Sequence, residues 1–128
     1  MAYNFSKIVD YDFDDAISKL TDELKEEGFG VLTEIDMKAT LKKKIDVDFR
    51  RYKILGACNP PSAYKALQAE ENIGVLLPCN VVVQEKEDGT VQVSAVNPLE
   101  TMKSVGNKSL EEIASDIGAR LKRVIENI

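Results

Sequence analysis

The stretch Lys53–Val83 constrains the fold of this 128-residue chain more than any other segment. It contains both cysteines, three of the four prolines and the strongest apolar runs. Each cysteine is followed by an asparagine, in the pairs Cys58-Asn59 and Cys79-Asn80. The first pair ends one predicted strand and the second begins another. The stretch therefore indicates where a site lies, but it does not name a substrate or a reaction.

Composition and termini exclude several classes of protein. Hydrophobic residues make up 44% of the chain and charged residues 30%, which is typical of a soluble globular protein. The length fits one domain over residues 1–128. The amino terminus lacks the basic segment and apolar run of a signal peptide, and no apolar run approaches the ~20 residues that span a bilayer. We expect no membrane association and a cytoplasmic location, where both cysteines are reduced.

The absence of histidine limits the chemistry further. It removes the usual general base, the Ser-His and Cys-His nucleophile pairs and the commonest zinc ligand. Two cysteines alone cannot form a closed zinc site, which takes four ligands. The sequence also lacks a nucleotide-binding glycine loop and a carboxylate cluster with metal spacing. The sequence therefore indicates no particular cofactor and no metal site, and it leaves open whether the chain is an enzyme.

Charge is distributed unevenly. Residues 38–53 contain seven basic and two acidic side chains, a balance of +5, whereas the remaining ten basic and twenty acidic side chains give −10. An acidic protein with one basic segment argues against general nucleic-acid binding. Two explanations stay open: Lys42–Lys44 complement the dipole of a helix in its last turn, or the segment binds an anion or a partner.

Hydrophobic periodicity and capping residues predict the order of the elements. We expect strands over 3–10, 29–35 and 52–57, a strand hairpin over 81–96, a helix over 13–27, a short helix after Asp36, a helix capped by Asn59 that packs through Ala63, Tyr64, Ala66 and Leu67, and a last helix from Ser109 with Glu112 in its capping box. This order predicts a two-layer α/β sandwich whose helices cover one face of a mixed sheet.

The hairpin fixes which residues share a face. A three-residue loop at 87–89 sets Val83 opposite Val93 and separates apolar from polar side chains, as a sheet with one covered face requires. The last loop residue is glycine, which suits the left-handed position of a type I turn with a G1 bulge. Extending this ladder sets Cys79 opposite Asn97 on the apolar face.

The central stretch, the glycine hairpin and the following segment VSAVNP resemble a bacterial and archaeal family known as domain of unknown function 302. The resemblance covers nearly the whole chain, and the matching positions are Cys58, Asn59, Pro60, Cys79 and Asn80. It implies a small two-layer α/β domain, with homodimers as an expectation, and no established activity, so no catalytic residue is carried over. Asn97 stands before Pro98 where the family more often has an acid, so a role that needs charge there is not expected.

The candidate site is a partly enclosed pocket lined by Cys58, Cys79 and Asn97, with Asn59 and Asn80 shaping its backbone. A thiol near a helix N-terminus can be reactive, but a free cysteine also packs as a small hydrophobe, so both interpretations stay open. Three function classes follow: a small-molecule or soft-metal binding module, a thiol enzyme or sulfur carrier using Cys58 or Cys79, and a homodimeric interaction domain without chemistry. We favour the binding module because neither thiol has an evident base.

Overall fold

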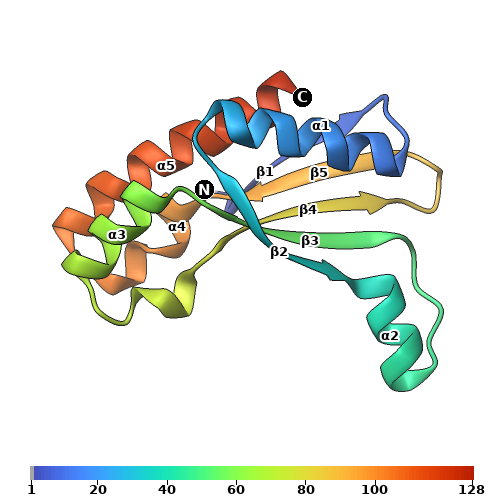
Figure 1. Ribbon diagram of the computed structural model, residues 1–128, viewed down its shortest axis with the longest axis horizontal. Helices are drawn as coiled ribbons and strands as arrows, with labels where there is room; N and C mark the ends of the chain where they lie inside the picture. The colour runs from blue at the N-terminus through green and yellow to red at the C-terminus, as the bar shows by residue number, and fades with distance from the viewer. Residues whose placement is uncertain (1) are drawn as a thin grey trace.

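The computed structural model describes residues 2–128 and shows a two-layer α/β sandwich (Figure 1). The elements in chain order are β1 (Asn4–Val9), α1 (Phe13–Glu26), β2 (Gly30–Asp36), α2 (Met37–Ile45), β3 (Tyr52–Cys58), α3 (Pro60–Ala69), the 3₁₀ turn η1 (Ile73–Leu76), β4 (Cys79–Glu85), β5 (Val91–Val96), α4 (Pro98–Thr101), the 3₁₀ turn η2 (Lys103–Val105) and α5 (Lys108–Asn127). Helices cover one face of the sheet, as predicted.

Within the described residues, the five strands lie in the order β1-β5-β4-β3-β2 and every pairing is antiparallel. The prediction of a mixed sheet is therefore wrong. The connection β1-α1-β2 leaves these two strands running in the same direction, and parallel strands make a sheet mixed only when they are neighbours. Here β1 and β2 lie at opposite edges of the sheet and never pair with each other.

The β4–β5 hairpin has the predicted register. Val83 pairs with Val93, and the loop closes with Lys86 N–H donating to Thr90 O at 2.7 Å and Gly89 N–H donating to Lys86 O at 2.9 Å. Gly89 has φ +85°, the left-handed conformation that glycine adopts without a side-chain clash. Valines from both strands consequently point to the covered face.

The main core lies between this face and the two long helices. Helix α1 starts at the cap Asp12, whose carboxylate accepts from Asp15 N–H at 2.9 Å, and it buries Phe13, Ala16, Leu20 and Leu24. Helix α5 buries a longer stripe, from Leu110 to Ile125. A second, smaller cluster joins α3, η1 and the region around α4 to α5, and it comprises Ala66, Ile73, Met102, Leu110 and Ala114. Among residues 2–128, no helix combines the length and the apolar character needed to cross a membrane.

Among residues 2–128, no helix lies on the opposite face of the sheet (Figure 1). A row of polar side chains crosses its β1 and β5 strands: Gln92 donates to the Ser94 hydroxyl at 3.1 Å, Ser94 and Ser6 share a hydrogen bond of 2.8 Å, and Ser6 donates to Asn4 at 2.6 Å. These side chains satisfy one another. This pattern is typical of an antiparallel sheet whose second face meets water.

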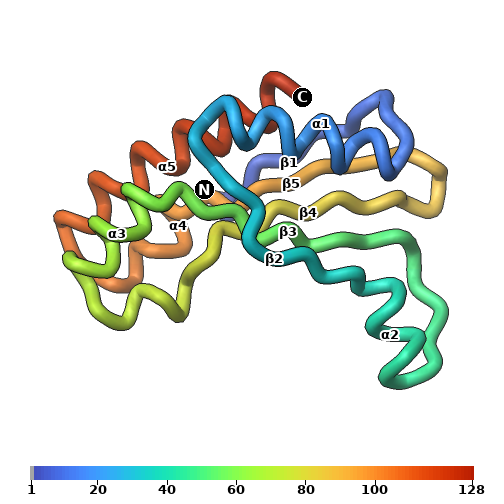
Figure 2. The backbone as a smooth tube through the Cα atoms, in the orientation of Figure 1, coloured from blue at the N-terminus to red at the C-terminus, as the bar shows by residue number. Residues whose placement is uncertain are grey.

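Strand β2 pairs with β3 along its length, and helix α2 continues from its end as an arm, residues 37–45, that extends beyond the sheet (Figure 2). Asp36 caps α2 by accepting from Ala39 N–H at 2.9 Å, and α2 buries none of its residues. Lys42–Lys44 lie in its last turn, as the helix-dipole explanation requires. The arm therefore contributes no residue to the buried core.

Two helix predictions need correction. Helix α5 begins at Lys108, because Asn107 rather than Ser109 is the cap and accepts from the N–H groups of Ser109 and Leu110. Tyr64 is 65% exposed, since α3 buries only Ala66 of the face expected to pack.

Candidate functional site

The two cysteines meet at one end of the sheet. Strands β3 and β4 are antiparallel neighbours, and their last pair joins Ala57 to Cys79. Cys79 lies on the covered face and is 7% exposed, whereas Cys58 follows Ala57 and is half-buried. Both thiols line the same pocket. The structure thus brings Cys58 and Cys79 together on the helix side, as the hairpin register predicts.

The pocket has a volume of about 330 Å³ and lies where the two hydrophobic clusters meet. Its floor is buried and comprises Phe29, Ala57, Ala66, Cys79, Pro98, Met102, Ala114 and Ile117. Its rim is open at Leu32, which is 66% exposed, and at Leu67, which is 45% exposed. Cys58, Asn59 and Ser62 are half-buried between floor and rim. The site is a hollow with an apolar floor and one accessible side.

Helix α3 forms one wall, and its sequence explains why space remains there. Asn59 caps the helix by accepting from Ser62 N–H at 3.2 Å, and Pro60 occupies the first turn, where a missing N–H costs nothing. Ala63 and Ala66 then face the pocket with side chains of a single methyl group. Small residues at this spacing leave the hollow unfilled.

The strand end below the pocket is packed closely. A β-carbon at Gly56 would lie 2.7 Å from Pro78 Cγ and closer still to Thr33 Oγ1. The Leu77–Pro78 peptide bond is cis, and Pro78 itself lines the pocket. Only glycine at position 56 lets β2 and the start of β4 approach in this way.

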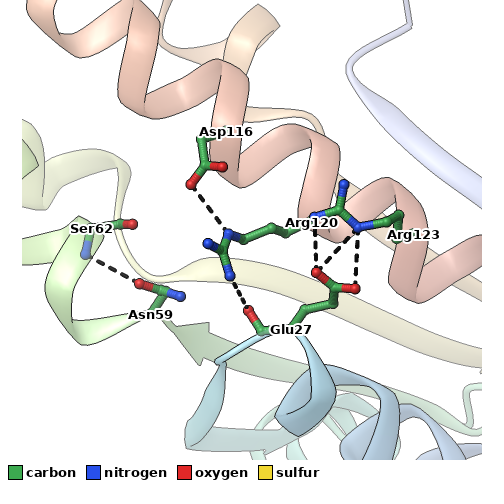
Figure 3. Close-up of polar contacts among 6 residues, drawn as sticks. All are labelled: Glu27, Asn59, Ser62, Asp116, Arg120 and Arg123. Carbon is green, nitrogen blue, oxygen red and sulfur yellow. Dashed lines mark hydrogen bonds and ion pairs between the residues drawn. The ribbon is translucent and has the colours of Figure 1, made fainter.

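Asn59 lies beside the end of α1, which is bonded to α5 (Figure 3). Gly28 has φ +85°, and a β-carbon there would lie 2.9 Å from Asn59 Nδ2. Arg120 Nη1 donates to Glu27 O at 3.0 Å, and Arg123 pairs with the Glu27 carboxylate at 2.9 Å. The hydrogen bond from Arg123 is the main reason that the pKa of Glu27 lies below its usual value. These contacts fix the end of α1 against α5 beside the α3 cap.

Burial sets the protonation state of the inner thiol, Cys79. It raises the pKa of Cys79 from 9.0 to about 11, with a smaller contribution from Cys58. Cys79 is therefore a neutral thiol at physiological pH, and a neutral thiol is a poor nucleophile and metal ligand. Within residues 2–128 no group of three or more Cys, Asp and Glu side chains is placed to hold a metal ion.

Two predicted residues lie outside the pocket. Asn80 is exposed and lines a separate hollow on the uncovered face, because side chains alternate along β4 and Cys79 points inward. Asn97 does not pair with Cys79, since the β4–β5 ladder stops at Val81 and Ala95. Its N–H instead donates to Tyr3 O at 2.7 Å as the chain turns into α4. The predicted pocket lined by Cys58, Cys79 and Asn97 is corrected accordingly.

Three further pocket residues, Leu32, Ser62 and Pro98, differ in how far the sequence indicates them. Leu32 reaches the rim because a bulge between Val31 and Thr33 interrupts the alternation of β2. Ser62 could have been found from its place one turn after Asn59. Pro98 enters through α4, a four-residue helix without a hydrophobic period to predict it.

Fold and site together define a small antiparallel α/β sandwich with an apolar, cysteine-containing pocket at one end of its sheet. The family model described as Domain of unknown function DUF302 matches residues 5–128, so the chain belongs to this family. A similar solved structure is that of an uncharacterized conserved DUF302 protein from Bacillus stearothermophilus. It is 31% identical, with 98% of each chain covered and a TM-score of 0.91. Comparison with curated proteins gives no match.

Proposed function

We propose that this chain is a binding module for a small, mainly apolar molecule held in the pocket between α3, α4, α5 and the ends of β3 and β4. The observation that carries this proposal is the cavity of about 330 Å³, in which Asn59 and Ser62 are the only polar side chains besides the two thiols among the lining residues described. Apolar pockets with few, well-placed polar groups are the usual form of small-molecule sites.

The cavity sets the size and charge of the ligand. An apolar cavity of ~150 Å³ holds benzene, so this one has room for about a dozen non-hydrogen atoms. A charged ligand is disfavoured because the floor offers no counter-charge, and burying an unpaired charge is costly. Ser62 is half-buried, and its hydroxyl supplies one hydrogen-bond donor and an acceptor for a neutral polar group of the ligand.

The inner thiol favours binding over thiol chemistry or metal ligation at Cys79. A thiol enzyme or sulfur carrier needs a thiolate, and a soft metal ion is ligated by thiolates. At Cys79 burial opposes that form by raising the pKa to about 11. The proposal keeps the cytoplasmic location expected for a protein with reduced thiols.

We also propose that the chain forms a homodimer. Strand β2 is an edge strand with an unpaired side among the described strands, and it exposes Leu32 and Ile35. Pairing with a second copy is one way to protect such an edge. Sedimentation at micromolar concentration should give about twice the 14.2 kDa mass of the chain, and a mass near that of one chain would contradict the dimer.

Ligand binding is tested by filling the pocket. We expect 1-aminonaphthalene, which is apolar and has eleven non-hydrogen atoms, to bind the wild-type protein with a rise in fluorescence. Ala63→Phe places a ring in the hollow and should weaken this binding at least tenfold. Ala119→Phe on the exposed side of α5 is the matched control and should bind like wild type.

Equal affinity in both variants would refute a ligand site at α3, provided that both unfold at wild-type denaturant concentrations. Native mass spectrometry of freshly purified protein then addresses the natural ligand. We expect a retained adduct in wild type that is lost in Ala63→Phe, and identification of its mass would give the ligand.

A further inference from the structure

Two regions with exposed apolar side chains adjoin the pocket, and a third group, Tyr3, Ile8 and Tyr11, lies in and beside β1. The first region is β2 with α2: Leu32 is exposed near the start of β2, and Ile45, the last residue of α2, is 64% exposed. The segment formed by α3 and η1 exposes Tyr64 and Leu67, and its Val75 is 86% exposed. Large exposed apolar patches mark interaction sites on soluble proteins. The pocket rim lies between the two regions, because both Leu32 and Leu67 belong to it.

The two regions also differ in charge. The end of α2 carries Lys42–Lys44 within the basic segment, while the chain outside residues 38–53 has a balance of −10. Lys42 is paired with Asp46 at 2.7 Å, but Lys43 and Lys44 make no ion pair among residues 2–128. The α3–η1 segment, residues 60–76, carries Glu70 and Glu71 against one basic residue, Lys65, a balance of −1. A basic, apolar helix and an acidic, apolar segment are complementary surfaces.

The direction of β2 decides how two copies can bring these surfaces together. The strand starts at Gly30, which pairs with the pocket residue Cys58, and it leads to α2 at its other end (Figure 1). In a two-fold antiparallel pairing, the start of one strand lies opposite the end of its partner. Each α2 then follows the partner strand at the point where Leu32 and the pocket rim lie.

We propose that two copies of this chain pair through β2 and that the α2 helix of each copy lies against α3 of the other, closing the mouth of its pocket. The dimer completes the site, and this part of the inference rests on the proposed ligand function. The uncovered sheet face is a weaker surface for a partner, because its Ser6, Ser94 and Gln92 side chains already hydrogen-bond to one another.

A matched pair of substitutions tests the interface. Ile45 and Ile8 are 64% and 48% exposed, so aspartate is tolerated at either position in the folded chain. Ile45 lies on α2, and Ile8 lies on β1 at the opposite edge of the sheet. In analytical ultracentrifugation, Ile45→Asp should weaken the dimer more than tenfold, and Ile8→Asp should leave it unchanged. A dimer weakened only by Ile8→Asp would overturn the proposal.

Cross-linking tests the contact itself. Equal amounts of ¹⁴N- and ¹⁵N-labelled protein, treated with a carbodiimide, should give mixed-isotope peptides that join Lys43 or Lys44 to Glu70 or Glu71. A dimer that yields only other mixed-isotope links would show that α2 lies elsewhere and would refute the arrangement.

The link to the pocket is tested with 1-aminonaphthalene. Release of the probe should be at least severalfold faster from Ile45→Asp than from Ile8→Asp, because the mouth is uncovered. Equal release rates would refute closure by the partner while leaving the pocket itself in place. A dimer that binds no probe in any variant would contradict the ligand function and leave the β2 interface in place.

Discussion

Replacing Cys79 by alanine should remove a pH-dependent part of the stability of this protein. Burial raises the pKa of the thiol from 9.0 to about 11 in the folded chain. The folded state therefore keeps this proton at a pH where the unfolded chain has lost it. The thiol's contribution to stability is complete below about pH 9 and is lost as the pH rises toward 11. At about pH 10 the two states differ tenfold in their proton binding, which corresponds to about 1.4 kcal/mol.

The assay is urea unfolding of reduced protein at about pH 7.5 and about pH 10. Other groups that titrate in this range, mainly lysines, are the same in both proteins, so they cancel in the difference between wild type and Cys79→Ala. Wild type should lose about 1.4 kcal/mol more than the variant over this interval. Cys58→Ala keeps the buried thiol and should retain the wild-type slope, since burial is the larger cause of the shift. Parallel pH profiles for wild type and Cys79→Ala would refute a buried, neutral thiol.

Two further substitutions test the walls of the pocket. Gly56→Ala should destabilise the fold by about 2 kcal/mol in urea unfolding, because the new methyl group meets Pro78 and Thr33; wild-type stability would contradict the close packing. Asn59→Ala removes the side chain that accepts from Ser62 N–H and should cost about 1 kcal/mol, while Asn59→Asp keeps the cap and most of the stability. Equal losses in the two Asn59 variants would contradict the capping role.

The sequence predicts local structure well where a pattern has one physical solution. The register of the β4–β5 hairpin follows from the sequence because only a three-residue loop puts Val83 opposite Val93 and keeps polar residues on the other face. The cap of α3 follows likewise, since Asn59 before Pro60 satisfies two rules for helix starts at once. The same register places Cys79 on the covered face near Cys58, which is the part of the site that the sequence supplies.

Long-range contacts account for what the sequence did not predict. Both Asn107 and Ser109 can cap α5, and the choice of Asn107 is reinforced by its bond to Ala69 O at 2.9 Å, a contact across 38 residues. All neighbouring strands are antiparallel because β1 and β2 lie at opposite edges of the sheet, and no local pattern encodes that placement. The placement of Asn97 outside the pocket follows from its pairing with Tyr3, again across a large sequence separation.

The ligand-binding account is tested most directly by locating a bound molecule in the pocket. The measurement is a set of intermolecular nuclear Overhauser effects between 1-aminonaphthalene and the methyl groups of the protein. The account predicts contacts to the methyls of Met102, Ala66 and Ala57, which belong to the pocket floor. Contacts confined to Val82 and Val96, which line the hollow on the uncovered sheet face, would contradict it.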